Sequence, residues 1–306
     1  MNKTLGEIKL KFGITPSPYF WGDFQRFVEW CMKVEEMGFD AILIPDHYQF
    51  PVPPFYSNEL VDAWTTLSYI SAKTSRIKLG SLVSPIPRYI PSQLAKLIAN
   101  VDLLSKGRVI AGFGVGYSPE EFINYSPTHS FDEPKILFEK FKEGVEIILK
   151  LWKEDKVTFK GKYYTLNDAV LLPKPLQRPR PPLWIGGVGR QMLEVAAKFF
   201  DCWVPPIVPS RITTLHTLQS TEQYEKRVRI IQEYLKRFRR KISDFTFGAL
   251  LRFASESDVE REAIDIIERY KKAGSQYFVI EFSPNQIKEY MKLTEKFARG
   301  VVPSFR

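Results

Sequence analysis

The chain has 306 residues, of which 44% are hydrophobic, and a formal net charge of +9 at pH 7. This length suits one large barrel or two ordinary domains, and no apolar run approaches the roughly 20 residues of a membrane span. The Lys and Arg residues are spread over many predicted helices and form no basic stripe interleaved with aromatic residues. We therefore expect a globular protein with no membrane or nucleic-acid partner.

The N-terminal sequence MNKTLGEIKLKFGI enters the first predicted strand without the apolar segment and cleavage site of a signal peptide. The two cysteines, Cys31 and Cys202, are too few for a metal-ligand set, and the sequence contains neither HExxH nor GxSxG. We expect a cytoplasmic protein with reduced, buried cysteines, no metal site, and neither metal-dependent nor serine-dependent hydrolysis.

Eight short runs rich in Val, Ile, Leu or Phe are each followed by a segment with helical periodicity. Such runs are typical of parallel strands buried on both faces. Eight strand-then-helix units predict an α/β fold, a (β/α)8 TIM barrel, with its active site at the carboxyl ends of the strands. We interpret residues 1–306 as a single domain. The predicted strands are Ile8–Ile14, Ala41–Pro45, Ile77–Val83, Arg108–Phe113, Leu183–Gly186, Cys202–Pro205, Phe245–Phe253 and Gln276–Phe282.

The helices between these strands have clear start and stop signals. Asp23 can cap the first helix and Gly38 can end it, while Pro91 opens the third helix and Gly107 ends it. One-sided apolar spacing predicts the others. These are Glu59–Lys73, Pro134–Lys153, Arg190–Phe200, Thr221–Arg240, Glu256–Ala273 and Pro284–Ala298.

Two segments interrupt the alternation of strands and helices. Val157–Leu171 alternates strand-forming residues around a Lys-Gly-Lys turn, which predicts a β-hairpin insertion between strands four and five. Pro205–Ser220 is polar and bounded by prolines, and we expect it to form a loop over the substrate. Arg211 and His216 are its candidate contacts.

The second strand ends in Ile44-Pro45-Asp46-His47. A His just past a strand end can project into the mouth of the barrel and exchange a proton near neutral pH. Asp46 could hydrogen-bond a cofactor ring or orient another group. The alternative is a His and an Asp that only shape the loop.

Two further strand ends carry glycines. Ser84-Pro85 follows Gly80 at the third strand and could form a bulge or a cis peptide bond, although these residues alone favour an ordinary strand that ends at proline. The fourth strand ends in GFGVGY, with Gly116 as the last glycine. No helix is predicted directly after it, so we reject a dinucleotide-binding Rossmann motif.

The fifth strand is followed by Gly186-Gly187-Val188-Gly189-Arg190, which opens a helix. Free backbone N–H groups at a helix N-terminus, together with the helix dipole and the charge of Arg190, favour a phosphate group. We interpret this segment as a phosphate site; the alternative is a plain turn.

Four segments in this order give the chain a family resemblance: GFDAILIPDH, IKLGSLVSPIPRYIPSQLAKLIANVDLLSKGRVIAGFGVGYSPEEF, FEKFKEGVEIILKLWKEDKVTFKGKYY and LLPKPLQRPRPPLWIGG. The chain resembles the bacterial-luciferase-like superfamily of flavin- or deazaflavin-dependent oxidoreductases. The resemblance implies a barrel that binds coenzyme F420 or FMN at its mouth, and commonly a homodimer.

The resemblance also assigns roles to residues. It implies that His47 is the acid/base and that Asp46 lies at the cofactor ring. It further implies that Ser84 and Pro85 prop the ring, and that Gly116 and the glycines Gly186 and Gly187 contact the cofactor. One position departs from the pattern, because Tyr117 stands where sugar-phosphate dehydrogenases of this superfamily have a catalytic Glu. Glu120 and Glu121 follow a few residues later. This difference argues against a sugar-phosphate dehydrogenase.

The leading hypothesis is a coenzyme F420-dependent oxidoreductase that transfers a hydride between the deazaflavin and a small-molecule substrate. The alternative is an FMN-dependent monooxygenase that uses O2 and reduced flavin from a separate reductase. A third hypothesis is a flavin-binding barrel without turnover. The IPDH sequence ending at His47 and the net charge of +9 favour coenzyme F420, which carries a phosphate and an acidic tail.

Overall fold

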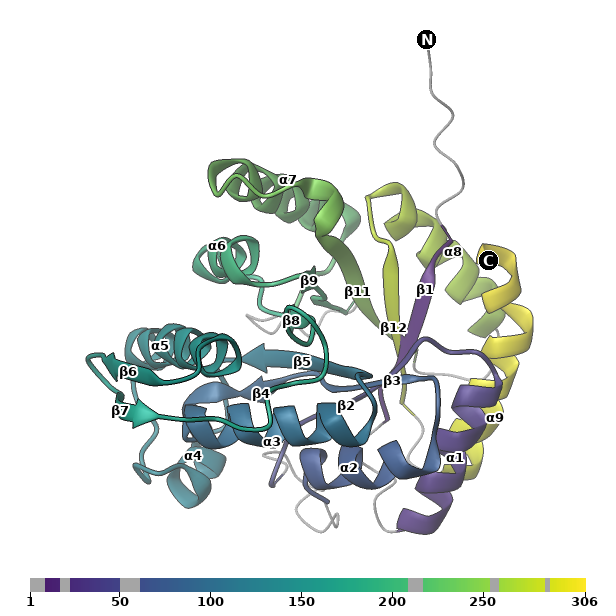
Figure 1. Ribbon diagram of the computed structural model, residues 1–306. Helices are drawn as coiled ribbons and strands as arrows, with labels where there is room; N and C mark the ends of the chain where they lie inside the picture. Colours follow the sequence, from purple (N-terminus) through teal and green to yellow (C-terminus); the bar gives the residue numbers. More distant parts are fainter. Residues whose placement is uncertain (1–8, 17–22, 50–60, 209–216, 254–258, 284–286) are drawn as a thin grey trace.

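The computed structural model describes residues 9–16, 23–49, 61–208, 217–253, 259–283 and 287–306. Within these ranges, eight parallel strands close into the predicted barrel, in the order β12-β1-β2-β3-β5-β8-β9-β11. Figure 1 shows the helices surrounding these strands. The barrel strands are β1 (Lys11–Ile14), β2 (Ala41–Ile44), β3 (Lys78–Ser81), β5 (Val109–Gly114), β8 (Leu183–Ile185), β9 (Cys202–Trp203), β11 (Thr246–Phe253) and β12 (Tyr277–Phe282).

Every predicted helix has a counterpart in the described part of the chain, and local contacts explain two of the ends that differ from the prediction. The second helix begins at Ala63 rather than Glu59, because the Asp62 carboxylate accepts a hydrogen bond from Thr65 N at 2.7 Å and caps it. The helix predicted to reach Arg240 ends at Arg237, and Arg239 has a positive φ of 56°. The helices are α1 (Phe24–Glu36), α2 (Ala63–Lys73), α3 (Pro91–Leu104), α5 (Pro134–Lys153), α6 (Arg190–Phe199), α7 (Thr221–Arg237), α8 (Val259–Lys272), α9 (Ile287–Gly300) and the short η3 (Ile86–Arg88), η4 (Ile242–Asp244) and η5 (Val302–Phe305). No helix in the described ranges is long and apolar enough to cross a membrane.

Two layers of apolar side chains fill the molecule. The larger one lies between the barrel and the helices, and the smaller one fills the barrel interior. Cys31 lies in the outer layer and Cys202 in the inner one, and both are buried free thiols, as predicted. The inner layer consists of Ala41, Leu43, Ile110, Trp184, Cys202, Val204, Tyr277 and Val279, with Leu82 and Leu250 packed against it.

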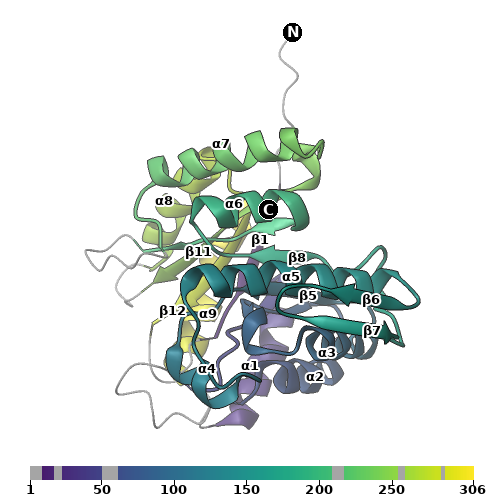
Figure 2. The ribbon, with the colours of Figure 1, turned by 90° about the vertical axis from the view of Figure 1, so that its left-hand side faces the viewer.

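The predicted hairpin insertion is present. Strands β6 (Val157–Lys160) and β7 (Thr165–Ala169) pair antiparallel, and Figure 2 shows them beside α5. Glu143 on α5 accepts hydrogen bonds from the backbone N–H groups of Lys162, Tyr163 and Tyr164 at 2.8–3.2 Å, which fixes the hairpin turn against the helix.

Besides η3, η4 and η5, three further short elements were not predicted. Helix α4 (Pro119–Tyr125) begins soon after β5, and β4 (Ser84–Pro85) pairs with β5. Strand β10 (Pro206–Ile207) lies within the predicted loop Pro205–Ser220, and Ile207 forms a bridge with Leu218. Arg211 and His216, the two candidate contacts of that loop, lie outside the described residues.

The third strand end differs from the prediction in one detail. The cis peptide bond there joins Leu82 and Val83, while Ser84–Pro85 is trans. The close backbone approach expected at Gly80 is present, because a Cβ atom on Gly80 would lie 2.4 Å from the Ile110 carbonyl oxygen on β5.

Candidate active site

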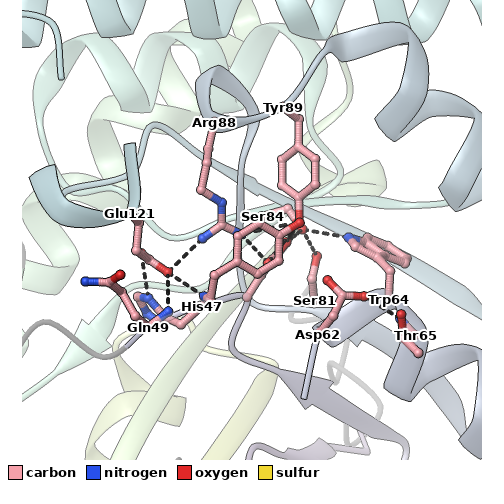
Figure 3. A network of polar contacts seen from close by, with 12 residues as sticks. His47, Gln49, Asp62, Trp64, Thr65, Ser81, Ser84, Arg88, Tyr89 and Glu121 are labelled. Atoms are coloured by element: carbon pink, nitrogen blue, oxygen red, sulfur yellow. Dashed lines mark hydrogen bonds and ion pairs between the residues drawn. The ribbon is translucent and has the colours of Figure 1, made fainter. Parts of the chain in front are cut away.

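His47 lies three residues past β2, at the carboxyl ends of the strands, which we call the mouth of the barrel. Its Nδ1 atom lies 3.0 Å from Glu121 Oε2, and the Tyr117 hydroxyl lies 3.3 Å from its Nε2 atom. The His47 side chain is 17% exposed. Both ring nitrogens therefore have a partner, while part of the ring still reaches the mouth. Figure 3 shows His47 facing Glu121.

Glu121 comes from α4, where it sits in the first turn after Pro119 and Glu120. Its Oε1 atom accepts hydrogen bonds from Tyr48 N at 2.6 Å and from Gln49 N at 3.4 Å. Burial raises the pKa of Glu121. The hydrogen bond and charge of His47 and the charge of Arg88 together lower this pKa by more, so it lies below its usual value. Glu121 is therefore a carboxylate held against the loop that carries His47.

Arg88 lies between two buried carboxyl groups, and Figure 3 shows it facing one of them, that of Glu121. Its Nη1 atom donates to Glu121 Oε1 at 2.9 Å, and its Nη2 atom donates to Asp46 Oδ1. The Arg88 side chain has no exposed surface, and its guanidinium lies 4.1 Å from the centre of the Tyr48 ring. A fully buried Arg is expected only where carboxylates and aromatic faces replace water.

Asp46, the residue before His47, is 2% exposed. Besides Arg88, its carboxyl group accepts hydrogen bonds from Ser84 Oγ and from the Tyr89 hydroxyl at 2.8 and 3.0 Å. Burial raises the pKa of Asp46, and the charge of Arg88 opposes this shift. The Ser84 hydroxyl also accepts from Trp64 Nε1 at 3.0 Å. Asp46 and Ser84 thus belong to the buried network around Arg88, and their contact with a cofactor ring stays a prediction.

Gly116 and Pro85, predicted at different strand ends, lie side by side. Gly116 has a positive φ of 87°, and a Cβ atom there would lie 2.9 Å from Pro85 Cβ and 2.6 Å from the Phe122 ring. Gly116 is therefore required where the chain leaves β5 and turns toward α4.

The glycines after β8 form the N-terminus of α6. Gly189 is its N-cap residue and makes no side-chain cap, and a Cβ atom on Gly189 would meet no atom within 4 Å. Arg190 is exposed and donates from Nε to the Tyr234 hydroxyl at 3.3 Å, while Val188 is buried in the outer layer. Free helix N–H groups, open space and an exposed cation fit a phosphate group.

The wall of the mouth that β11 and β12 form carries two charged residues. Leu250 on β11 and Val279 on β12 face the barrel interior, so Arg252 and Glu281, two residues further along these strands, face the mouth. Arg252 Nη2 donates to Glu281 Oε2 at 2.9 Å, and the Arg252 side chain is 53% exposed. Burial raises the pKa of Glu281. This wall offers an accessible cation to a polar ligand.

Sequence reasoning missed the roles of Arg88, Glu121 and the tyrosines around them. Two signals were available: Pro119 followed by two acidic residues, which is typical of a helix start, and one Arg in the apolar stretch after the third strand. In the described ranges, no three His, Cys, Asp or Glu residues gather as they would around a metal ion.

Comparison with known proteins shows the family of this chain. Residues 8–300 match the family described as luciferase-like monooxygenase, and the chain belongs to this family. An F420-dependent glucose-6-phosphate dehydrogenase from Kineococcus radiotolerans is 32% identical over 183 residues, 58% of this chain and 51% of that protein. A protein of the same name from Amycolatopsis mediterranei is 27% identical over 85% of this chain and 80% of its own length. An F420-dependent hydroxymycolic acid dehydrogenase from Mycobacterium tuberculosis is 29% identical over 58% of this chain and 48% of its own length. The chain spans about half the length of the first and last of these relatives.

Solved structures share the fold. An F420-dependent secondary alcohol dehydrogenase superposes with a TM-score of 0.80 at 18% identity, covering 97% of this chain and 99% of that chain. A monooxygenase from Streptomyces bottropensis superposes with a TM-score of 0.79 at 20% identity, covering 97% of this chain and all of that chain. These matches confirm the predicted TIM barrel.

Proposed function

We propose that this protein is a coenzyme F420-dependent oxidoreductase that uses His47 to exchange a proton with a small-molecule substrate. The observation that carries this proposal is the position of His47, with a buried carboxylate on Nδ1 and its Nε2 side turned to the mouth. The names of the relatives from Kineococcus, Amycolatopsis and Mycobacterium, all F420-dependent dehydrogenases, support this cofactor.

The carboxylate of Glu121 favours a proton on Nδ1, which leaves Nε2 as the atom that takes or gives a proton. Asp46 and Glu121 are two buried acids, and Arg88 is the one buried base between them. A proton taken up by His47 adds a second positive charge and so balances the charges of this group. Tyr117 holds the other side of the ring. The bound deazaflavin would supply or accept the hydride.

The residues of this chain fit a phosphate-bearing flavin or deazaflavin. The N–H groups of Gly187–Arg190 and the charge of Arg190 would hold its phosphate, with Gly186 leading into this segment. Ser84 and Pro85 would prop the ring, and Asp46 and Gly116 would also lie at the cofactor. Arg252 is the cation best placed to meet a polar group of the substrate.

Gly189→Val tests the phosphate site. Its φ of −73° and ψ of 149° suit valine, and no neighbouring atom obstructs the new side chain, so the fold should be retained. The side chain would fill the space assigned to phosphate, and affinity for coenzyme F420 should fall by about tenfold or more, measured by fluorescence titration. Glu133→Val, at the exposed N-cap of α5 with similar angles, is the matched control. Unchanged affinity in Gly189→Val would place the phosphate elsewhere.

The second candidate is an FMN-dependent monooxygenase supplied with reduced flavin by a separate reductase. The family description and a related diketocamphane monooxygenase solved with FMN favour it, the latter with a TM-score of 0.72 at 15% identity. We rank it second because the relatives named above are all F420-dependent.

Titration of the same protein preparation with coenzyme F420 and with FMN separates the candidates. We expect tight binding of coenzyme F420 and binding of FMN weaker by about tenfold or more, followed by substrate-dependent change in the F420 absorbance. Tight FMN binding with O2-dependent turnover would favour the monooxygenase. Binding of either cofactor without any turnover would favour the non-catalytic barrel.

The substrate is a small molecule whose identity we leave open. Tyr117 beside His47, in place of the Glu of sugar-phosphate dehydrogenases, favours a substrate other than a sugar phosphate. We further propose that residues 1–306 form one barrel domain that acts in the cytoplasm as a homodimer. The two buried free thiols suit a reducing compartment.

A further inference from the structure

The two carboxylate oxygens of Glu121 have different partners. Oε1 accepts from Arg88 Nη1 and from the backbone of Tyr48 and Gln49, whereas Oε2 faces His47 Nδ1. A carboxylate that could rotate would share its charge among all of these donors. The three donors on Oε1 instead fix the plane of the group, so that Oε2 points at one ring nitrogen of His47.

Among these donors, only Arg88 is charged, and it is itself fixed on its far side. Its Nη2 atom donates to Asp46, which is also held by Ser84 and Tyr89. The ring of Tyr48 lies against the guanidinium at 4.1 Å. A planar guanidinium can donate to two carboxylates in fixed directions, which the single ammonium group of a lysine cannot reproduce.

We propose that Arg88 is a positioning residue that, through Glu121, selects the Nδ1–H tautomer of His47. A carboxylate at Nδ1 can only accept, so the neutral ring must carry its proton there. Nε2 then bears the lone pair and faces the Tyr117 hydroxyl and the mouth. Without Arg88, Glu121 would lose the charged donor that keeps its carboxylate ionised and oriented. The His47 ring would then return to the mixture of tautomers of a free imidazole.

The tautomer is a property of the protein without cofactor or substrate, while its use in turnover rests on the proposed function. The chain contains only three His residues. Labelling them with 15N and recording spectra at neutral pH distinguishes a protonated ring nitrogen from an unprotonated one. The His47 signals are assigned by their absence from the His47→Gln protein.

We expect His47 in the unaltered protein to carry its proton on Nδ1. In Arg88→Met the Nδ1–H preference should be lost, and in Arg88→Lys it should be reduced, because lysine keeps the charge but not the two-sided geometry. Arg108→Met is the matched control. Arg108 is another buried Arg, but it precedes β5 and donates mainly to backbone carbonyls such as those of Ile77 and Ser71. Its removal should destabilise the fold without changing the His47 tautomer.

Three outcomes of this experiment would contradict the proposal. An unaltered protein with the proton of His47 on Nε2 would overturn the proposal, even if neither Arg88 variant folds. So would an Arg88→Met protein that keeps the Nδ1–H form, or an Arg108→Met protein that loses it as well. Failure of the proposed function would look different, because the tautomer would be as expected while coenzyme F420 failed to bind or to turn over.

Discussion

His47→Ala should lower turnover by about 10²- to 10⁴-fold while the affinity for coenzyme F420 changes by no more than a few-fold. The imidazole is the group at the mouth that can exchange a proton near neutral pH, and its removal leaves the Gly187–Arg190 phosphate site intact. Steady-state kinetics at saturating cofactor, with a fluorescence titration of the same preparation, measure both quantities.

The control for this substitution is His129→Asn. His129 is exposed, has a positive φ of 48° that Asn tolerates, and its Nδ1 atom lies 3.1 Å from the Ile123 carbonyl oxygen of α4. It should leave turnover unchanged. If His47→Ala retains turnover within a few-fold of the unaltered protein, another group moves the proton and the assignment fails.

Glu121→Gln should lower turnover by about 10²-fold or more, with little change in cofactor affinity. The amide has nearly the same shape as the carboxylate, but it is neutral and no longer compels the proton of His47 onto Nδ1. Glu120→Gln, one residue earlier in the same helical turn and exposed, is the control and should be near neutral.

The double variant His47→Ala with Glu121→Gln gives a stricter test. If Glu121 acts through His47, the double variant should be no slower than His47→Ala alone, because the second change removes nothing further from the reaction. Additive losses would mean that Glu121 acts independently of the imidazole, and the Glu121–His47 pair would not be a functional unit.

The barrel could be predicted because its signals are local. Each strand is a short apolar run closed by Gly, Pro, Ser or Asp, and each helix shows one-sided apolar spacing, so neither depends on distant residues. The helix at Pro134–Lys153 has the predicted bounds because Pro opens it and a full apolar stripe runs along its length. Where prediction and structure differ, as at Asp62 and Arg239, a single capping or backbone contact decides the end of a helix.

The site could be predicted only in part. His47 stands directly after a strand, so its position followed from the fold. Glu121 belongs to a helix of seven residues, too short for a periodic pattern, and its partner Tyr48 lies 73 positions away in the chain. The role of Arg88 was not predicted, because its burial and ion pairing are properties of the folded chain. The sequence therefore predicted which end of the barrel to examine but not the network behind the imidazole.

The backbone pairing around the barrel is uneven, because its strands differ in length. We call the pairing around β9 the seam. β8 contains three residues and β9 only two, and β9 pairs with each of its neighbours, β8 and β11, through two residues. Partial opening of a protein begins where few backbone bonds must break. A ligand that contacts both the Gly187–Arg190 segment, which follows β8, and Arg252 on β11 would connect the strands on either side of β9 and so span the seam. Its binding would then oppose opening, by about 2.7 kcal/mol at a concentration 100 times its Kd, and would make the resistance of the barrel to heat and proteases depend on cofactor supply.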